Sequence, residues 1–520
     1  MKILSADEIR LVEKRCFERY STEAELMLRA GTACFEKIVD KYGEELKNAE
    51  ISVFCGNGKN AGDGFVIARL LWNFGADASI ILCDKAPSIA EPLAYFEQAK
   101  KSRVKIENFT EYKQRMAEYR KNSNIVNHNN FTKRRFIIDC IFGIGFHGEA
   151  RKPFDEVFKT INESGATVIS IDTPSGTNAT TGEVCENAIN ADFTIAISTL
   201  KYAHIQPPAN ALCGELSVVD IGIPEDCYDK GYPETIEEPD IKKCFIKRDM
   251  NSNKGSFGHQ LNICSSYKMF GAGVIATKAA LRSGAGLVKL MLPKSAYPLA
   301  AAHLIQPLFE PVEENKEKTF SKTAVKDVNT QMSWANSIVL GCGIGVNEDT
   351  KEICEFVLKN SEVPVILDAD GINCINRRIS ILKEVKAPIV LTPHPLEMAR
   401  LISKSTAEIQ ENRIKTAKEF AKENGIILVL KGANTVVTDG EKVFVNLTGN
   451  PSMAMGGTGD MLSGMIGAFV AQNMSALDAA KCAVYIHGLC GDYAAEKLSQ
   501  RGILVCDMIE QLGALMSIFE

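Results

Sequence analysis

Residues 449–469 read GNPSMAMGGTGDMLSGMIGAF, a glycine-rich turn followed directly by an apolar helix that we expect at 461–470. Such a turn places the backbone N–H groups of Gly457, Thr458 and Gly459 at the positive end of the helix dipole, where they can surround an anion. This anion site beside Asp460 suits phosphoryl transfer, because the amides neutralise charge on the phosphate while the carboxylate accepts the proton of the attacking hydroxyl. A carboxylate in a first helical turn is also favourable to the dipole by itself, which is the structural alternative for Asp460.

Short apolar runs elsewhere in this half of the chain precede further loops of the same kind. Residues 426–430 lead into KGANT (431–435), 388–391 into TPHPLE with His394, and 337–340 into GCGIG (341–345). Each loop alone is weak evidence for a functional site. His394, for example, has the alternative of being a simple turn residue. Together, several strands that end in such loops predict one cleft in an α/β domain. Its other strands are expected at 260–264, 287–292 and 364–367.

The first half of the chain predicts a second domain of the same class. Ser5 with Glu8, and Thr22 with Glu25, form capping boxes that begin two helices. Apolar runs then alternate with helical or polar stretches, which is typical of a mainly parallel, doubly wound sheet. The runs are 51–55, 79–83, 136–141, 167–171, 193–197 and 216–221.

A polar stretch rich in Pro, Asp, Glu and Lys, between residues 223 and 258, predicts the boundary between the domains. We therefore expect an N-terminal domain at 1–225, a linker at 226–253 and a C-terminal domain at 254–520. Two further polar segments, 105–135 and 311–329, are expected to be surface elaborations, the first with a helix within 111–120.

Three loops of the first domain predict its ligand site. GNGKNAGDG (56–64), FGIGFHG (142–148) and DTPSG (172–176) each follow an expected strand, and the carboxyl ends of parallel strands meet at one edge of a sheet. The glycines and the helix N-terminus suit a phosphate-bearing ligand. The alternative explanation for the glycines is that they form tight turns that need positive φ. Asn60, Asp139 and Ser175 supply hard oxygens that suit a cation, and Asp139 has the alternative of a turn cap.

Composition excludes several classes of function. With 520 residues, 45% hydrophobic and 24% charged, the chain is globular and long enough for at least two domains. The net charge of -6 supports neither nucleic acid nor an anionic membrane as partner, and no apolar stretch is long enough to span a bilayer. The 16 cysteines form no C-x-x-C pair, which predicts reduced thiols and no zinc site. We expect a cytoplasmic homo-oligomer.

GNGKNAGDG, IDCIFGIGFHG and SIDTPSG, in this order, resemble the YjeF N-terminal domain, an NAD(P)H-hydrate epimerase. The resemblance implies a Rossmann-like αβα domain that interconverts the R and S epimers of hydrated NAD(P)H (NADHX and NADPHX), with bound potassium. Asn60, Asp139 and Ser175 would hold the potassium ion, and Asp172 is our candidate for moving the proton. The implied contacts to the hydrate are Lys59, Asn60, Ala61, Gly62, Asp63, Gly143, Ile144, Gly145, Phe146, His147, Gly148, Glu149 and Asp172.

KGANT, TPHPLE, GCGIG and GNPSMAMGGTGD resemble the ribokinase-like ADP-dependent NAD(P)H-hydrate dehydratases, from about residue 254 to the C-terminus. The resemblance implies that ADP phosphorylates the hydroxyl of the S epimer, after which loss of phosphate restores NAD(P)H and leaves AMP, with magnesium accompanying the nucleotide. The hydrate would lie at Ala272, Gly345, His394 and the catalytic Asp460. The implied contacts to ADP are Lys431, Gly432, Ala433, Asn434, Thr435, Asn450, Gly456, Gly457, Thr458 and Gly459.

A second functional hypothesis stays open from the residues alone. An anion hole beside a general base serves any hydroxyl acceptor, so the C-terminal half is also compatible with a small-molecule kinase that acts on a vitamin precursor. In that hypothesis the N-terminal half is a non-catalytic binding or dimerisation module. A dehydratase releases phosphate and restores NAD(P)H absorbance, whereas a kinase retains a phosphorylated product.

Overall fold

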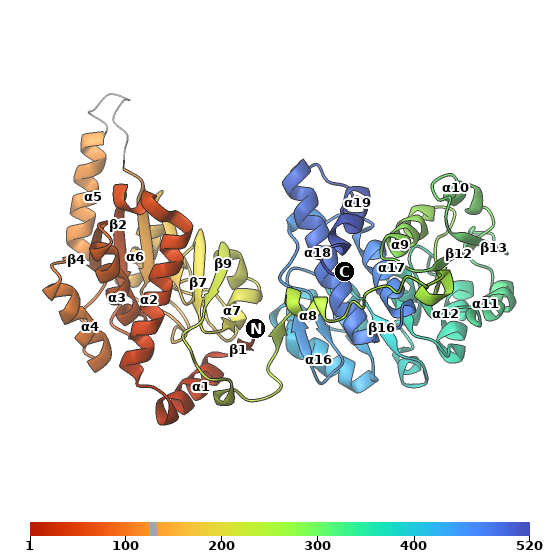
Figure 1. Cartoon of the computed structure of the whole chain (residues 1–520), viewed down its shortest axis with the longest axis horizontal. Helices are drawn as coiled ribbons and strands as arrows, with labels where there is room; N and C mark the ends of the chain where they lie inside the picture. Colours follow the sequence, from red (N-terminus) through yellow and green to blue (C-terminus); the bar gives the residue numbers. More distant parts are fainter. Residues whose placement is uncertain (124–132) are drawn as a thin grey trace. The chain divides into compact units, whose positions relative to one another are not determined.

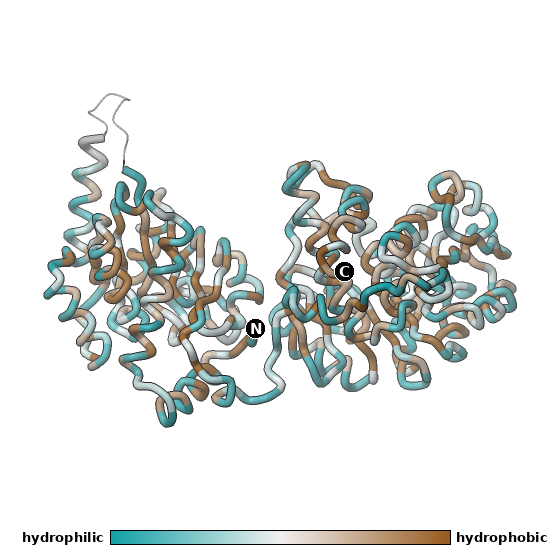
Figure 2. Tube along the Cα trace, viewed as in Figure 1, coloured by the Kyte–Doolittle hydropathy of each residue, from teal (hydrophilic) through white to brown (hydrophobic). Residues whose placement is uncertain are grey.

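The computed structural model describes residues 1–123 and 133–520. The chain forms two compact units, Met1–Tyr232 and Pro233–Glu520. Each unit has its own sheet with helices against it (Figure 1). Apolar residues concentrate along the strands and the central helices of each unit, as Figure 2 shows. The expected α/β class with two domains built on parallel sheets is confirmed.

The first unit contains a seven-stranded sheet, all parallel, in the order β4-β3-β2-β5-β6-β7-β9. All six strands expected in this half are present, and β4 adds an edge strand within a segment that we expected to be surface. Separately, β1 and β8 form a short parallel pair. The strands are β1 (Ile3–Leu4), β2 (Glu50–Cys55), β3 (Asp77–Leu82), β4 (Lys105–Asn108), β5 (Arg135–Cys140), β6 (Thr167–Ile171), β7 (Phe193–Ile197), β8 (Leu200–Lys201) and β9 (Glu215–Val219).

Helices cover both faces of this sheet because successive residues of each buried strand point to opposite sides. Val53 of β2 packs into the apolar core beneath α2, α3 and α4, while its neighbour Phe54 packs into the core beneath α5 and α6. The two predicted capping boxes are present, at Ser5 and Thr22. The helices are α1 (Ala6–Arg19), α2 (Glu23–Tyr42), η1 (Gly43–Asn48), α3 (Lys59–Asn73), α4 (Ala90–Lys101), α5 (Phe109–Ser123), α6 (Phe154–Asn162), α7 (Tyr202–Ile205), η2 (Ala209–Leu212) and η3 (Glu225–Cys227).

The second unit contains a ten-stranded sheet in the order β10-β19-β18-β17-β16-β15-β14-β11-β12-β13. Its strands are parallel except where β18 pairs with β17 and β19. The six strands expected from the apolar runs are confirmed, whereas the short strands at both edges have no such signal. The strands are β10 (Glu234–Thr235), β11 (His259–Ile263), β12 (Leu287–Pro293), β13 (Leu308–Val312), β14 (Ser337–Leu340), β15 (Val365–Leu367), β16 (Ile389–Leu391), β17 (Ile427–Leu430), β18 (Val436–Thr438) and β19 (Val443–Val445).

The glycine-rich helix predicted from residues 461–470 is α17, and it lies in the core of the second unit. Every residue from Met461 to Ala471 is buried, and α9, α18 and α19 pack around it. The helices are α8 (Glu238–Lys242), η4 (Lys254–Phe257), α9 (Phe270–Arg282), α10 (Tyr297–Ala301), η5 (Lys322–Ala324), α11 (Val325–Met332), α12 (Glu348–Asn360), α13 (Asp370–Ile375), η6 (Ile379–Lys383), α14 (Pro395–Ile402), α15 (Thr406–Glu411), α16 (Arg413–Asn424), η7 (Pro451–Met453), α17 (Thr458–Ala471), α18 (Ala476–Leu498) and α19 (Val505–Met516).

The segment that we expected to be a linker, 226–253, contributes structure to the second unit. Along the chain, the first unit ends at Tyr232 and the second begins at Pro233. Strand β10 begins at the next residue and pairs with β19. Ile236 is buried and donates its N–H to the carbonyl of Val445 at 2.9 Å. The division therefore lies inside the predicted boundary stretch at 223–258. Residues 233–253 belong to the second unit, and a two-residue edge strand has too few apolar residues to be recognised in the sequence.

The two polar segments contain more core than expected. The first holds β4 and α5, whose Phe109 and Tyr112 are buried, in agreement with a helix at 111–120. Its residues 124–132 lie outside the described part of the chain. The second contributes the buried Phe320 and Val328.

All 16 cysteines are free thiols, and Cys506 alone among them is exposed. In the described part of the chain, no helix combines the length and the hydropathy that crossing a bilayer requires.

Candidate active sites

The three loops predicted for the first unit converge at the carboxyl ends of β2, β5 and β6. The sheet order changes direction between β2 and β5, the position at which open parallel sheets form ligand crevices. Gly143 shows how closely the loops approach each other. A Cβ atom at this glycine would lie 2.9 Å from Asp172 Oδ2 and 3.5 Å from Asn60 Cγ. The predicted convergence of these loops is therefore present.

Asp172 forms a buried ion pair with Lys201, a residue that we did not predict. Lys201 Nζ lies 2.5 Å from Asp172 Oδ1, and the lysine side chain is 1% exposed. The same ammonium donates to the carbonyls of Ile197 and Thr199, at 2.7 and 3.1 Å. Asp172 also accepts the N–H of Ile144 and adopts a φ of +71°, which is uncommon outside glycine. The surroundings therefore hold this carboxylate in one orientation.

His204 fixes the backbone behind this pair. The N–H of Lys201 donates to His204 Nδ1 at 3.0 Å, so Nε2 carries the ring proton and donates to the carbonyl of Asp172 at 2.7 Å. Burial, and next the positive charge of Lys201, lower the pKa of His204 to about 4. The imidazole is therefore neutral near pH 7 and acts as a fixed hydrogen-bonding bridge.

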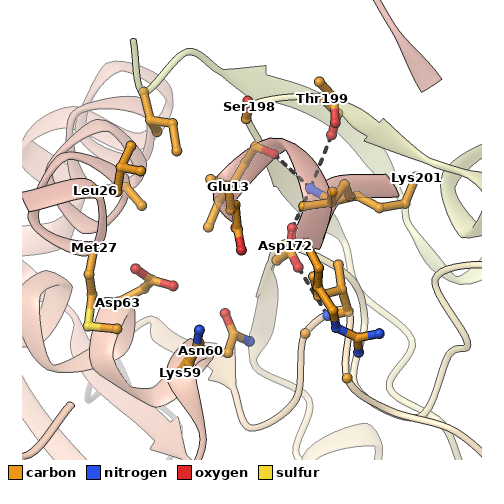
Figure 3. A pocket seen from close by; sticks show the side chains of 18 of the residues that line it. Glu13, Leu26, Met27, Lys59, Asn60, Asp63, Asp172, Ser198, Thr199 and Lys201 are labelled. Carbon is orange, nitrogen blue, oxygen red and sulfur yellow. Dashed lines mark hydrogen bonds and ion pairs between the residues drawn. The ribbon is translucent and has the colours of Figure 1, made fainter. Parts of the chain in front are cut away.

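A cavity of about 450 Å³ opens between these loops and the first two helices. Val12, Leu26 and Met27 form an apolar wall, and carboxyl groups from three elements face the space (Figure 3). Such a cavity suits a planar ring held between apolar side chains and oriented by a few polar groups. The carboxyl groups are those of Glu13, Asp63 and Asp172.

Burial raises the pKa values of two carboxyl groups at the cavity, those of Asp63 and Glu13. Burial raises the pKa of Asp63 well above its ordinary value, and the negative charges of Asp172 and Glu13 add to this rise. Burial also raises the pKa of Glu13, although Lys59 opposes it. Nothing in the local sequence of α1 marks Glu13, because only the packing of α1 onto the loops brings it to the cavity.

The three residues predicted to hold a cation are linked by hydrogen bonds, since Ser175 contacts Asp139 and shares the carbonyl of Phe142 with Asn60. Ser175 donates its hydroxyl to Asp139 Oδ1 at 2.6 Å and its N–H to Asp139 Oδ2 at 2.9 Å. Asn60 donates to the carbonyls of Phe142 and Ile171, while its Oδ1 is buried without a hydrogen-bond partner in the described residues. An oxygen left in this way beside a carboxylate fits a cation that accepts oxygen ligands.

The other predicted contacts in the first unit differ in how they face the cavity. Lys59 lines it and pairs with Glu23, with 2.6 Å between Nζ and Oε1. Ala61 is fully buried, and a Cβ atom at Gly62 would lie 2.2 Å from Met27 Sδ, so close packing explains this glycine. The lining continues through Gly143, Ile144, Gly145 and Phe146, whereas His147, Gly148 and Glu149 are exposed beyond it.

In the second unit, the N-terminus of α17 has the geometry predicted for an anion site. Gly457 precedes the helix with a φ of +98°, which favours glycine, and no side chain caps the first amides. Burial first, and then the negative charge of Asp368, raise the pKa of Asp460 to about 7. A carboxyl group with this pKa suits proton transfer near neutral pH.

Asp368, at the end of β15, is the centre of a polar network that we did not predict. Lys431 Nζ lies 2.7 Å from its Oδ1, and the hydroxyl of Ser463 donates to its Oδ2 at 2.7 Å. Burial alone would raise the pKa of Asp368, but Lys431 and the hydrogen bonds bring it below its ordinary value. A Cβ atom at Gly459 would lie 3.2 Å from Lys431 Nζ, so the KGANT and GGTGD loops meet here.

Three of the residues predicted to contact the hydrate, His394, Gly345 and Ala272, follow strands β16, β14 and β11 of the sheet. His394 caps α14 and accepts the N–H groups of Leu396 and Glu397 on Nδ1, and burial lowers its pKa. Gly345 donates its N–H to Asp370 Oδ2 at 2.8 Å. Ala272, in the first turn of α9, packs against the GCGIG loop. A Cβ atom added at Gly343 would lie only 2.8 Å from the Cβ of Ala272.

The predicted ADP contacts fall into two groups. Lys431 donates its N–H to the carbonyl of Pro393, which joins KGANT to the His394 loop, and Thr435 closes the KGANT turn by donating to the carbonyl of Gly432 at 2.9 Å. Asn450 instead hydrogen-bonds Asp492 of α18, at 2.8 Å. KGANT is therefore tied to the His394 loop, whereas Asn450 is tied to α18.

One cluster in the described residues could hold a metal ion. The ligand atoms of Cys342, Asp368 and Asp460 all lie within 4.8 Å of one another. Carboxylate oxygens suit magnesium and a thiol does not, so the two aspartates are the relevant donors.

Comparison with known proteins assigns both units. Residues 23–203 match the sequence family described as the YjeF-related protein N-terminus, and residues 261–513 match the family described as NAD(P)H-hydrate dehydratase. A bifunctional NAD(P)H-hydrate repair enzyme of Coxiella burnetii is 32% identical over 514 residues, which span 98% of either chain. One of Thermofilum pendens is 30% identical over 518 residues, which span 98% of this chain and 95% of that protein.

This chain belongs to the family of bifunctional NAD(P)H-hydrate repair enzymes.

The fold of this repair-enzyme chain agrees with a solved structure. A ribokinase-like superfamily protein of Enterococcus faecalis aligns with a TM-score of 0.50 at 24% identity, covering 56% of this chain and 98% of its own. The ribokinase-like fold expected for the second half is therefore confirmed. Membership of the repair-enzyme family also favours the first of the two functional hypotheses over a vitamin-precursor kinase.

The matched family ranges leave out one part of the first site of this repair enzyme. The match begins at residue 23, so α1 with Glu13 lies outside it, although α1 forms one wall of the cavity. Lys201 and Asp368 lie inside the matched ranges. Lys201 is the last residue of β8, and Asp368 directly follows β15. The position at a strand end is the signal that could have found these two residues.

Proposed function

We propose that the first unit interconverts the R and S epimers of hydrated NADH and NADPH, and that the second unit uses ADP to dehydrate the S epimer. The observation that supports this most directly is full-length similarity to bifunctional repair enzymes, combined with a distinct site in each unit. AMP, phosphate and NAD(P)H are the products of the second unit.

In the second unit, the geometry supports phosphorylation followed by elimination. The amides at the N-terminus of α17, together with Lys431, stabilise the negative charge on the transferred phosphate. Asp460 accepts the proton of the hydrate's hydroxyl as its oxygen bonds to phosphorus and AMP departs. The C–O bond then breaks with its electron pair on the departing phosphate, and loss of a proton from the adjacent ring carbon to water restores the C=C bond of NAD(P)H. Phosphate leaves far more readily than hydroxide would. His394 and Gly345 flank the space in which the hydrate would lie.

In the first unit, the cavity between α1, α2 and the three loops would take the hydrated nicotinamide ring. Asp172 is the proton-transfer residue, and the buried ion pair with Lys201 holds its carboxyl group in one orientation. The remaining predicted contacts to the hydrate belong to this proposal.

Two cations belong to the proposal. Potassium would be held by Asn60, Asp139 and Ser175, because Asn60 Oδ1 is a buried acceptor that lacks a protein donor among the described residues. Magnesium would accompany the nucleotide phosphates near Asp368 and Asp460. A cytoplasmic homo-oligomer remains our expectation for the assembled protein.

We expect replacement of Asn60 by alanine to weaken the dependence of epimerisation on potassium. The change removes the unpartnered Oδ1 and leaves Asp139 with all its hydrogen bonds from Ser170, Ser175 and Ile141. Epimerisation rates would be measured against potassium concentration, with N-methylglucamine keeping the ionic strength constant. A variant with an unchanged potassium curve would contradict the assignment of Asn60.

The two activities are expected to survive separation between Tyr232 and Pro233. A cut at this point keeps β10 paired with β19, and each fragment retains its own sheet and core. Residues 1–232 should epimerise purified hydrate epimers without nucleotide, and residues 233–520 should convert one epimer to NAD(P)H with ADP. Chromatography of the epimers and absorbance of NAD(P)H measure the two reactions.

Loss of one reaction from a folded fragment would contradict the assignment of that reaction to the unit concerned. A phosphorylated product that accumulates without phosphate release would instead support the kinase alternative.

A further inference from the structure

Asp63 is a buried carboxyl group that the fold does not use. The residue is 8% exposed and lines the cavity of the first unit from the second turn of α3. Its side chain makes no hydrogen bond and no ion pair with any described residue. Burial of an unpaired carboxyl group is unfavourable for folding, so a group of this kind is expected to have a role in the site.

Asp63 and Asp172 reach the cavity from different sides. Figure 3 shows the Asp63 carboxyl beside Met27 on one side, and the Asp172–Lys201 pair on the other, with Glu13 between them. The electrostatic environment agrees with this arrangement, since the charges of Asp172 and Glu13 act on Asp63 and that of Lys201 opposes them. Asp63 is thus buried without a partner, whereas Asp172 is paired with a buried lysine.

We propose that Asp63 is a second catalytic proton-transfer group of the epimerase, acting on the opposite face of the hydrated ring from Asp172. This proposal rests on the epimerase activity proposed above, and it also specifies which bond of the hydrate breaks. An epimerase must treat the two faces of one carbon alike, and two carboxyl groups on opposite sides of the cavity, one unpaired and one paired with Lys201, can supply an acid on one face and a base on the other.

The step balances without an external reactant. Protonated Asp63 gives its proton to the hydroxyl of the hydrate, and the C–O bond breaks with its electron pair on oxygen, so that water leaves. The ring nitrogen supplies its lone pair and forms a C=N⁺ bond. A second water adds to the same carbon from the other face, and the Asp172 carboxylate accepts its proton. The reverse reaction uses the two groups in exchanged roles.

The oxygen of the hydrate reports which bond breaks. Hydrate labelled with ¹⁸O at the hydroxyl would be incubated with the full-length enzyme in unlabelled water, without ADP, and the two epimers would be separated and weighed by mass spectrometry. We expect each newly formed epimer to have lost the label. Epimerisation with the label retained would overturn C–O cleavage, since opening of the ring at nitrogen keeps the oxygen. A wild-type enzyme with no epimerisation would instead contradict the proposed function.

The variant Asp63→Asn separates catalysis from packing. Asparagine fills the same space but donates no acidic proton, so kcat should fall by about 10²- to 10⁴-fold with little change in KM. The wild-type pH profile should contain a group whose loss of a proton lowers kcat, and the variant should lack it. Because Glu13, Asp172 and Lys201 also face Asp63, Glu13→Gln is compared to assign this group. The exposed Asp84→Asn serves as the matched control with wild-type kinetics.

Stability gives an independent readout. A carboxyl group whose pKa is raised in the folded state destabilises the protein as the pH rises through the window between its unfolded and folded pKa values. Asp63→Asn should therefore unfold at a temperature at least as high as the wild type at pH 8. A variant with normal kcat would overturn the proposal, and so would one whose loss of activity followed a loss of stability.

Discussion

Replacement of Asp460 by asparagine is expected to lower ADP-dependent dehydration by about 10²- to 10⁴-fold, the range typical of a lost general base. Nucleotide binding should remain, because we propose that the amides of α17 and Lys431, and not Asp460, hold the phosphates. The wild-type rate should rise with pH up to about 7, since burial and Asp368 raise the pKa of Asp460 to about 7 and only the deprotonated form accepts a proton. Release of phosphate and AMP measures the reaction, and calorimetric titration with ADP measures binding.

Asp478 provides a matched control for the alternative that Asp460 only complements the helix dipole. Both aspartates occupy the third position of a helix, Asp460 in α17 and Asp478 in α18, where Asp478 accepts the hydroxyl of Ser475. Asp478→Asn should leave dehydration unchanged. If the two variants behaved alike, with full activity in both, the dipole explanation would be sufficient.

Replacement of Lys201 by methionine is expected to abolish epimerisation and to destabilise the first unit. The change leaves Asp172 buried without its counter-ion, and breaking a buried pair in this way typically costs about 3–5 kcal/mol. Epimerisation should fall by at least about 10²-fold, because Asp172 loses its counter-ion and with it the contact that orients the carboxyl group. Calorimetry of the full-length chain follows the unfolding transition of the first unit.

The double variant Asp172→Asn/Lys201→Met distinguishes catalysis from folding. Removal of both charges leaves neither group buried and unpaired, so stability should recover while epimerisation stays absent. Lys41→Met, which breaks a surface pair with Glu215, is the matched lysine control and should change stability by about 1 kcal/mol or less. A stable double variant that still epimerised the hydrate would rule out Asp172 as the proton-transfer residue.

Local patterns in the sequence predicted the class of the fold and the loops that form both sites. Apolar runs such as 51–55 and 337–340 became strands because a strand buried on both faces needs continuous apolar residues. GGTGD became a helix N-terminus because Gly457 adopts the positive φ that glycine permits. In GNGKNAGDG, glycine allows a close approach instead, since a Cβ atom at Gly56 would lie 2.4 Å from the carbonyl oxygen of Ile141. These signals are local, so a single segment carries each of them.

Edge strands and the domain boundary were less accessible to prediction. β10, β18 and β19 have two or three residues each, which is too few for a pattern of apolar and polar residues to be recognised. Their pairing with neighbouring strands, and not their own composition, determines their conformation. The same reason explains why the segment at 226–253 could not be divided correctly by its polar composition.

By itself, the sequence determined which residue types follow each strand, and hence the family and the chemistry that these loops support. Tertiary structure alone decided the partners: Asp172 meets Lys201, Asp368 meets Lys431 across 63 positions, and Glu13 and Asp63 enter one cavity from different helices. The physical reason is that burial and pairing set the charge of each carboxyl group, and both depend on sheet order and helix packing that no local pattern encodes.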